Sequence, residues 1–304
     1  MNKKIIAICS VIFVLVVGAL LYGRSQLVTA QDDNKITVLS TFTVISDMVQ
    51  EVGGDKINAI SLTKPGVEIH GYEPTPGDLV RASSADIIFD NGLNLEVWAA
   101  KLYQGLPQTP HVTLSTGIEV IQISEGAYKD KPNPHAWMSP KQALVYVENI
   151  REALVELSPE NEAYFNGRAR DYSDKIRALD VQLDTALAEI PPSHRYLVTC
   201  EGAFSYLTKD YGLNELYLWA INDESQGSPQ QIARVVDAVK EHQIPTVFCE
   251  STVAPHIQEE VAKASGAKLG GRLYVDSLSD ARGPAPTYLA LLEYTVSTII
   301  AGLK

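Results

Sequence analysis

The stretch at residues 158–190 reads SPENEAYFNGRARDYSDKIRALDVQLDTALAEI and lies near the middle of the 304-residue chain. Its first three residues, Ser-Pro-Glu, form a helix start signal: a capping hydroxyl, a proline in the first turn and an acid near the helix N-terminus. Two prolines, Pro191 and Pro192, end it. Apolar side chains recur at steps of three and four along one face, at Phe165, Ala169, Tyr172, Ile176, Leu179, Leu183, Leu187 and Ile190. We therefore predict one helix over 158–190, roughly 45 Å long.

This helix has one apolar face, so it is not a membrane span. It could be a long surface helix, or two helices broken at Asn166-Gly167. The interpretation that we follow is a rigid connector between two lobes, because the helix divides the chain into nearly equal halves.

Short β-rich runs alternate with helical patterns on both sides of the connector, which predicts parallel sheets with helices on both faces. The predicted fold is α/β with two lobes, each a mostly parallel sheet flanked by helices, joined by one long linking helix. The lobes are expected at 31–157 and 191–304, with the linking helix at 158–190. Strands are expected at 36–40, 57–62, 86–90, 111–114, 195–200, 215–220, 246–249 and 268–275, and further helices at 95–106, 140–157 and 285–303.

Residues 1–30 have the features of an export segment. Lys3 and Lys4 precede an apolar run, and Val28-Thr29-Ala30 is a plausible cleavage site of small residues. The alternative is an uncleaved anchor, because the apolar run is nearly long enough to span a membrane. Cys9 sits in a poor lipobox, since a large residue precedes it. In either case we expect a periplasmic or otherwise extracytoplasmic protein, with the N-terminal segment as a candidate membrane anchor.

The part of the chain after residue 30 is strongly acidic. Three of the 25 basic residues and none of the 37 acidic residues lie in residues 1–30, which leaves 22 against 37 and a net charge of −15. Such a chain does not favour nucleic acid or an anionic membrane surface. It is compatible with a cationic ligand, and is also ordinary for an exported protein.

Two cysteines, Cys200 and Cys249, follow the export segment. Each ends a predicted strand, and each is followed by a glutamate. In an oxidising compartment this even number predicts one disulfide bond, and strands one step apart in a parallel sheet can bring their ends within bridging range. Two buried free thiols are the alternative.

The common enzyme motifs are missing from the sequence. It contains no Gly-x-Ser-x-Gly and no His-Glu-x-x-His, and the glycine-rich run at 266–272 lacks the ending of a P-loop. An exported metal-dependent hydrolase would need an open coordination position and a nearby general base. The candidate base is Glu250, which we instead expect to support a metal ligand from behind. We therefore expect a binding protein and not an enzyme.

Four side chains that can bind metals follow predicted strands. His70 and His135 lie in loops of the first half, Glu201 directly ends the first strand of the second half, and Asp276 ends its last strand. In open α/β sheets ligands bind beyond the carboxyl ends of the strands. Taken singly, each residue has an ordinary explanation as a surface histidine or a helix cap. Their common placement predicts a site between the lobes.

These residues carry a resemblance to the metal-binding solute-binding proteins of ABC importers, in particular to the manganese-binding class with a single linking helix. The matching motifs extend over roughly residue 36 to the C-terminus. One departure is Asn133, where the family often has aspartate. The motifs are Gly66-x-Glu68-x-His70-x-Tyr72-Glu73-Pro74, Pro134-His135-Ala136-Trp137, Glu201-Gly202-Ala203-Phe204, Glu250-Ser251 and Tyr274-Val275-Asp276-Ser277.

The resemblance implies that His70, His135, Glu201 and Asp276 bind the transported ion, and that the partner is a membrane permease. Zinc-type members tend to have histidine at the third position and a histidine-rich loop between the first two ligands. Here the third position is Glu201, and residues 118–131 contain no histidine. Carboxylates are harder ligands than imidazoles, so we expect Mn²⁺, with Fe²⁺ or Zn²⁺ as alternatives. We also expect a monomer.

Overall fold

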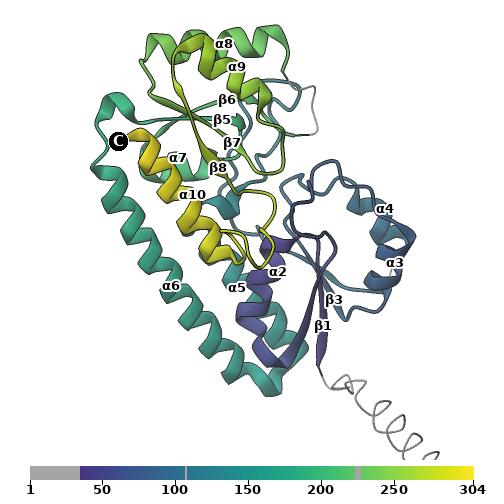
Figure 1. Ribbon diagram of the computed structural model, residues 1–304. Coiled ribbons are helices and arrows are strands. Elements are labelled where there is room, and N and C mark those ends of the chain that lie inside the picture. Colours follow the sequence, from purple (N-terminus) through teal and green to yellow (C-terminus); the bar gives the residue numbers. More distant parts are fainter. Residues whose placement is uncertain (1–34, 107, 223–226) are drawn as a thin grey trace, which may run out of the picture. The chain divides into compact units, whose positions relative to one another are not determined.

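In the computed structural model the described residues are 35–106, 108–222 and 227–304 (Figure 1). The chain divides into the units Met1–Lys35 and Ile36–Lys304, and the fold below is that of the second unit. The predicted export segment 1–30, with Cys9, lies outside the described residues. Within the described part of the chain, no helix has both the length and the apolar character needed to cross a bilayer.

The N-terminal lobe is built on a four-stranded parallel sheet with the strand order β2-β1-β3-β4. Along the chain its strands alternate with helices, as the sequence pattern predicts. The strands are β1 (Ile36–Ser40), β2 (Ile57–Ser61), β3 (Ile87–Asp90) and β4 (His111–Thr113). The helices are α2 (Thr43–Gly53), α3 (Pro76–Ser83), α4 (Ala99–Gln104) and α5 (Pro140–Leu157), with 3₁₀ turns at Gly54–Lys56 and Ala136–Met138.

The C-terminal lobe contains two parallel strand pairs, β5 with β6 and β7 with β8. Strands β5 and β7 lie next to each other, and a disulfide bond joins Cys200 of β5 to Cys249 of β7. The predicted disulfide is therefore confirmed. The strands are β5 (Tyr196–Glu201), β6 (Asn214–Trp219), β7 (Thr246–Glu250) and β8 (Lys268–Leu273); the helices are α7 (Ser205–Tyr211), α8 (Pro229–Glu241), α9 (His256–Ser265) and α10 (Tyr288–Leu303).

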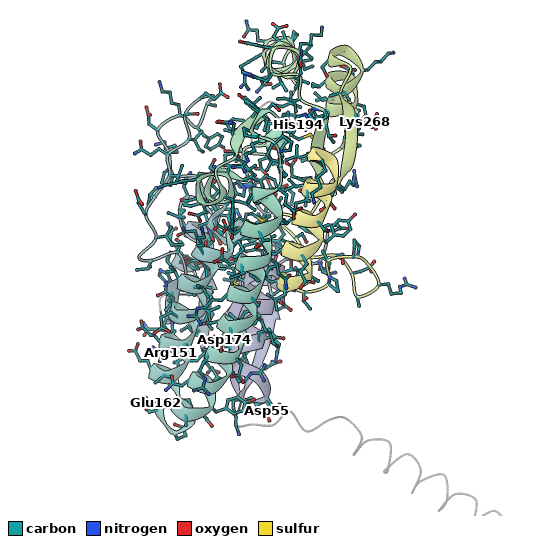
Figure 2. All side chains as sticks on the ribbon, turned by 90° about the vertical axis from the view of Figure 1, so that its left-hand side faces the viewer. Asp55, Arg151, Glu162, Asp174, His194 and Lys268 are labelled. Carbon is teal, nitrogen blue, oxygen red and sulfur yellow. A yellow bond between two sulfur atoms is a disulfide. The ribbon has the colours of Figure 1, made fainter. Side chains whose placement is uncertain are left out.

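The connector is a 3₁₀ turn at Pro159–Asn161 followed by the 27-residue helix α6 (Glu162–Ala188). The helix is continuous through Asn166-Gly167, so the alternative of two broken helices is wrong. Every residue of the predicted apolar face is buried. In Figure 1, α6 runs beside α10. Figure 2 shows the same helix from another side, with Glu162 near its start and His194, in the 3₁₀ turn Pro192–His194, beyond its end.

Besides the connector, whose helix α6 covers Glu162–Ala188 and not 158–190, three predicted boundaries differ from the structure by two residues or more. The last strand ends at Leu273 and not at residue 275: the Tyr274 N–H donates to Thr295 on α10, and the Val275 carbonyl accepts from the Trp137 indole. Helix α4 is shorter than predicted, because the Glu96 carboxylate accepts backbone N–H groups of the preceding loop. The closing helix begins three residues late, at a Thr287 cap.

Candidate metal centre

Four segments from the two lobes bring the predicted site residues together. His70 lies in the loop after β2, His135 precedes the 3₁₀ turn at 136–138, Glu201 is the last residue of β5, and Asp276 lies three residues beyond β8. All four side chains are buried, with exposed fractions of 7% for His70 and 0% for the others. One potential ligand atom from each lies within 4.8 Å of the other three.

The shortest distances within this group converge on the two Nε2 atoms. His70 Nε2 lies 3.1 Å from His135 Nε2 and 3.1 Å from Glu201 Oε1. Asp276 Oδ1 lies 3.8 Å from His70 Nε2 and 3.6 Å from His135 Nε2. This oxygen is buried and has no hydrogen-bond partner among the described residues. Because buried polar atoms are normally paired, an oxygen left in this position is suited to a cation.

Local contacts on the backbone fix the first histidine. The loop turns at Gly66, whose φ of 81° is easily adopted only by glycine. The Glu68 carboxylate then accepts the backbone N–H of His70 at 3.0 Å, and the Trp98 indole N–H donates to the Ile69 carbonyl at 2.9 Å. These two bonds hold the N–H and the C=O of the Ile69–His70 peptide group, from which the ring projects.

The second histidine is positioned by Asn133. Its Oδ1 accepts the backbone N–H of His135 at 3.0 Å and lies 3.0 Å from the ring Nδ1. This contact assigns the ring proton to Nδ1 and leaves Nε2 as the metal-facing atom. The Asn133 amide also donates to the Gly202 carbonyl at 2.6 Å. A carboxylate at this position could make the first contacts but could not donate to Gly202, which gives the departure from aspartate a structural reason.

Asn222 holds the two carboxylates. Its backbone N–H donates to Glu201 Oε1 at 2.8 Å, and its side-chain amide donates to Glu201 Oε2 at 2.9 Å and to Asp276 Oδ2 at 3.3 Å. The Thr252 hydroxyl lies 3.5 Å from the same Asp276 oxygen. Sequence reasoning missed Asn222; the available signal was its place just after β6, at the edge where the ligands gather.

Glu250 contacts Glu201 through the backbone of that residue. Its Oε2 accepts the Glu201 N–H at 3.3 Å. Gly202, the next residue, is closely packed: a Cβ there would lie 3.0 Å from the Tyr217 ring and 3.2 Å from the Ala220 carbonyl. The end of β5 therefore depends on close packing that a larger residue would disturb.

Burial and the mutual charges determine protonation in the site. Burial lowers the pKa of His70, but Glu201, Asp276 and Glu68 outweigh this and raise it to about 10. Burial lowers the pKa of His135 to about 4. Burial, together with the charge of Asp276, raises the pKa of Glu201 well above its usual value, and burial raises that of Glu250 to about 8. A cation placed among these carboxylates would relieve their repulsion.

The donor set of two imidazole nitrogens and two carboxylate oxygens fits several divalent ions, including Mn²⁺, Fe²⁺ and Zn²⁺. A second group of metal-competent residues, Cys200, Cys249 and Glu250, does not offer thiolates because both cysteines are in the disulfide bond. The remaining histidines, His111, His194, His242 and His256, are not part of either group.

Comparison with known proteins gives consistent matches over most of the chain. Residues 38–302 match the family described as ZnuA, zinc-uptake complex component A, periplasmic. The iron-binding protein YfeA of Yersinia pestis is 51% identical over 268 residues, which cover 88% of this chain and 86% of YfeA. The manganese ABC transporter substrate-binding lipoprotein PsaA of Streptococcus anginosus is 31% identical over 282 residues, covering 90% of this chain and 91% of PsaA.

A solved structure matches the fold as well. The Mn-bound periplasmic metal binding protein from Candidatus Liberibacter asiaticus superimposes with a TM-score of 0.84 at 39% identity, covering 89% of this chain and 100% of that chain. The two-lobe fold and the family resemblance are therefore confirmed. The periplasmic family description also confirms the expected extracytoplasmic location. The chain belongs to the ZnuA family of metal-binding substrate-binding proteins of ABC transporters.

Proposed function

We propose that this protein captures Mn²⁺ between its lobes through His70, His135, Glu201 and Asp276 and delivers it to the permease of an ABC importer. The observation that carries the proposal is the convergence of four buried ligand atoms, two from each lobe, within 4.8 Å. One chain supplies all four ligands, which supports a monomer as the working unit. Metal analysis of the purified protein, followed by a competition titration of Mn²⁺ against Zn²⁺, tests the ion and the site.

Two features support manganese over zinc as the physiological ion. The third ligand position is a carboxylate, and the segment 118–131 has no histidine. That segment instead contacts the C-terminal lobe: Ile123 packs with Tyr217, and Glu125 forms a 2.6 Å ion pair with Arg234. Zn²⁺ is still expected to bind the isolated protein tightly, because affinity for nitrogen and oxygen sites rises from manganese to zinc.

We further propose that the protein has no enzymatic activity. The candidate general base, Glu250, has an exposed fraction of 0% and binds the Glu201 backbone, which supports a positioning role. Hydrolysis of ester or phosphoester probes by the metal-loaded protein would contradict this proposal.

The proposed organisation keeps the lobes at 31–157 and 191–304 with the linking helix at 158–190. Helix α10 belongs to the second lobe by sequence but contacts both lobes, because it packs on β8 and also on α2 of the first lobe. We propose that residues 1–30 direct export, and that cleavage after residue 30, lipid-type processing or an uncleaved anchor leaves the binding unit outside the cytoplasmic membrane.

Replacing Glu201 with histidine is expected to shift the preference for Zn²⁺ over Mn²⁺ by about tenfold, because an imidazole offers one nitrogen and favours four-coordination. The substitution also removes the two oxygens that Asn222 contacts. Both metals should be titrated against both proteins. Glu201→Gln is the matched control, which should weaken both metals with a smaller change in their ratio. An unchanged ratio in Glu201→His would mean that Glu201 is not a ligand.

Metal binding is expected to change the separation of the lobes only slightly. A continuous helix links them, and hydrogen bonds also join them, including the buried bonds from Asn133 to the Gly202 carbonyl and from Trp137 to the Val275 carbonyl, and the part-buried bond from Ser139 to Asp210. X-ray scattering profiles of protein treated with chelator and of protein saturated with Mn²⁺ should superimpose within error. A marked decrease in the radius of gyration on adding Mn²⁺ would contradict a rigid connector.

A further inference from the structure

Each ligand histidine of the N-terminal lobe is preceded, two residues earlier, by a side chain that reaches the other lobe. Asn133 contacts the backbone of His135 and donates to the Gly202 carbonyl. Glu68 repeats this arrangement: its Oε1 accepts the His70 N–H at 3.0 Å, and its Oε2 accepts from the Asn222 amide at 2.9 Å. Both histidines are thus connected to the second lobe by hydrogen bonds through the residue two positions earlier in the chain.

The two connections differ in their exposure to solvent. Asn133 has an exposed fraction of 2%, and three of the four proposed ligands have 0%. Glu68 and Asn222 are only half-buried, as is Thr252, which contacts Asp276 beside Asn222. The less buried side of the site is therefore the side that the Glu68–Asn222 pair covers.

The Asn222 side chain is held in one orientation. Its Oδ1 accepts the Trp219 indole N–H at 2.8 Å, so its amide nitrogen must face the carboxylates. That nitrogen lies within hydrogen-bond range of three carboxylate oxygens, one each from Glu68, Glu201 and Asp276. Two of these belong to proposed ligands. The carboxylate of Glu68 is instead outside the four-residue group, so its bond to Asn222 joins the lobes without holding the ion.

We propose that the hydrogen bond between Glu68 and Asn222 is a gate contact, which must open for the ion to pass between the site and solvent. This inference rests on the proposed metal site. A gate contact differs from a positioning contact in its kinetic effect: opening it lowers the barrier to entry and to exit alike, so both rates rise and the dissociation constant changes little. Loss of a positioning contact would raise the dissociation rate and leave association unchanged.

The substitution Glu68→Gln separates these roles. The amide oxygen of the new side chain still accepts the His70 N–H, while its NH₂ group meets the NH₂ group of Asn222 and the bond between the lobes is lost. Because hydrogen bonds to charged groups are the stronger class, we expect both rate constants for Mn²⁺ to rise about tenfold, with the dissociation constant within about threefold of the parent. Trp137, whose ring centroid lies 5.2 Å from that of His135, gives the fluorescence signal.

The measurement is stopped-flow mixing of the purified protein with Mn²⁺ for association, and of the Mn²⁺-loaded protein with excess EDTA for dissociation. Glu125→Gln is the matched control. The ion pair between Glu125 and Arg234 also joins the lobes, but it includes none of the four proposed ligands. We expect parental rates for this control.

Three results would contradict the proposed gate contact. Two concern Glu68→Gln: unchanged rate constants for Mn²⁺, or a rise in the dissociation rate constant alone. The third is an equal rise of both rate constants in Glu125→Gln, which would indicate a general loosening of the lobes. Failure of the metal site itself is read separately, from His135→Ala: parental Mn²⁺ binding in that variant would show that the ion binds elsewhere.

Discussion

Replacing His135 with alanine is expected to weaken Mn²⁺ binding by at least about 100-fold, and His70→Ala by a similar factor. Partners that only orient a metal ligand cost about 10–100-fold when removed, so loss of a ligand should equal or exceed the upper value. Each substitution removes one of two imidazole nitrogens from a site where the ligand atoms lie within 4.8 Å. Titration with Mn²⁺ in competition with a chelator measures the affinity.

His111→Ala is the matched control for these variants. His111 is an exposed histidine of the same lobe that stacks on Tyr103 away from the site. The His111→Ala variant should bind Mn²⁺ like the parent. Circular dichroism melting should show all three variants folded at the titration temperature, because His70 and His135 lie in loops and not within the strands or helices of the core. If both site variants bind like the parent, the four-residue site is wrong.

The sequence predicts the fold well where one physical rule dominates. The apolar face of α6 follows from helical periodicity, and each predicted face residue is buried. The grouping of His70, His135, Glu201 and Asp276 follows from the rule that ligands gather beyond the carboxyl ends of parallel strands. These predictions need only the order of the elements and the residue types at their ends.

The remaining parts of the site depend on contacts that no local pattern contains. Asn222 and Glu68 are 154 residues apart and meet only because the lobes close on each other. Asp276 was expected directly at a strand end, but Tyr274 and Val275 leave the strand to bond with Thr295 and Trp137. Such partners become visible only when the tertiary structure places them.

Removal of the disulfide is the second large effect that we expect. Replacing both Cys200 and Cys249 with alanine should lower the free energy of unfolding by about 4 kcal/mol, because the bond closes a long loop and restricts the unfolded chain. The two cysteines are 49 residues apart, and both are buried, with exposed fractions of 0% and 2%. Alanine is chosen over serine because it buries no hydroxyl that would need a partner. Urea unfolding measures the change.

The slope of the urea transition separates loss of the cross-link from loss of packing. An unfolded chain without the bond exposes more surface, so the slope m should increase in the double variant, whereas a simple packing defect would leave m unchanged. Mn²⁺ affinity should fall by no more than about tenfold, because Glu201 loses only an indirect support and keeps its contacts with Asn222 and Glu250. Thiol counting of the denatured parent should find no free thiol at these two positions. Free thiols there, or a double variant with parental stability and slope, would remove the disulfide as a stabilising element of the C-terminal lobe.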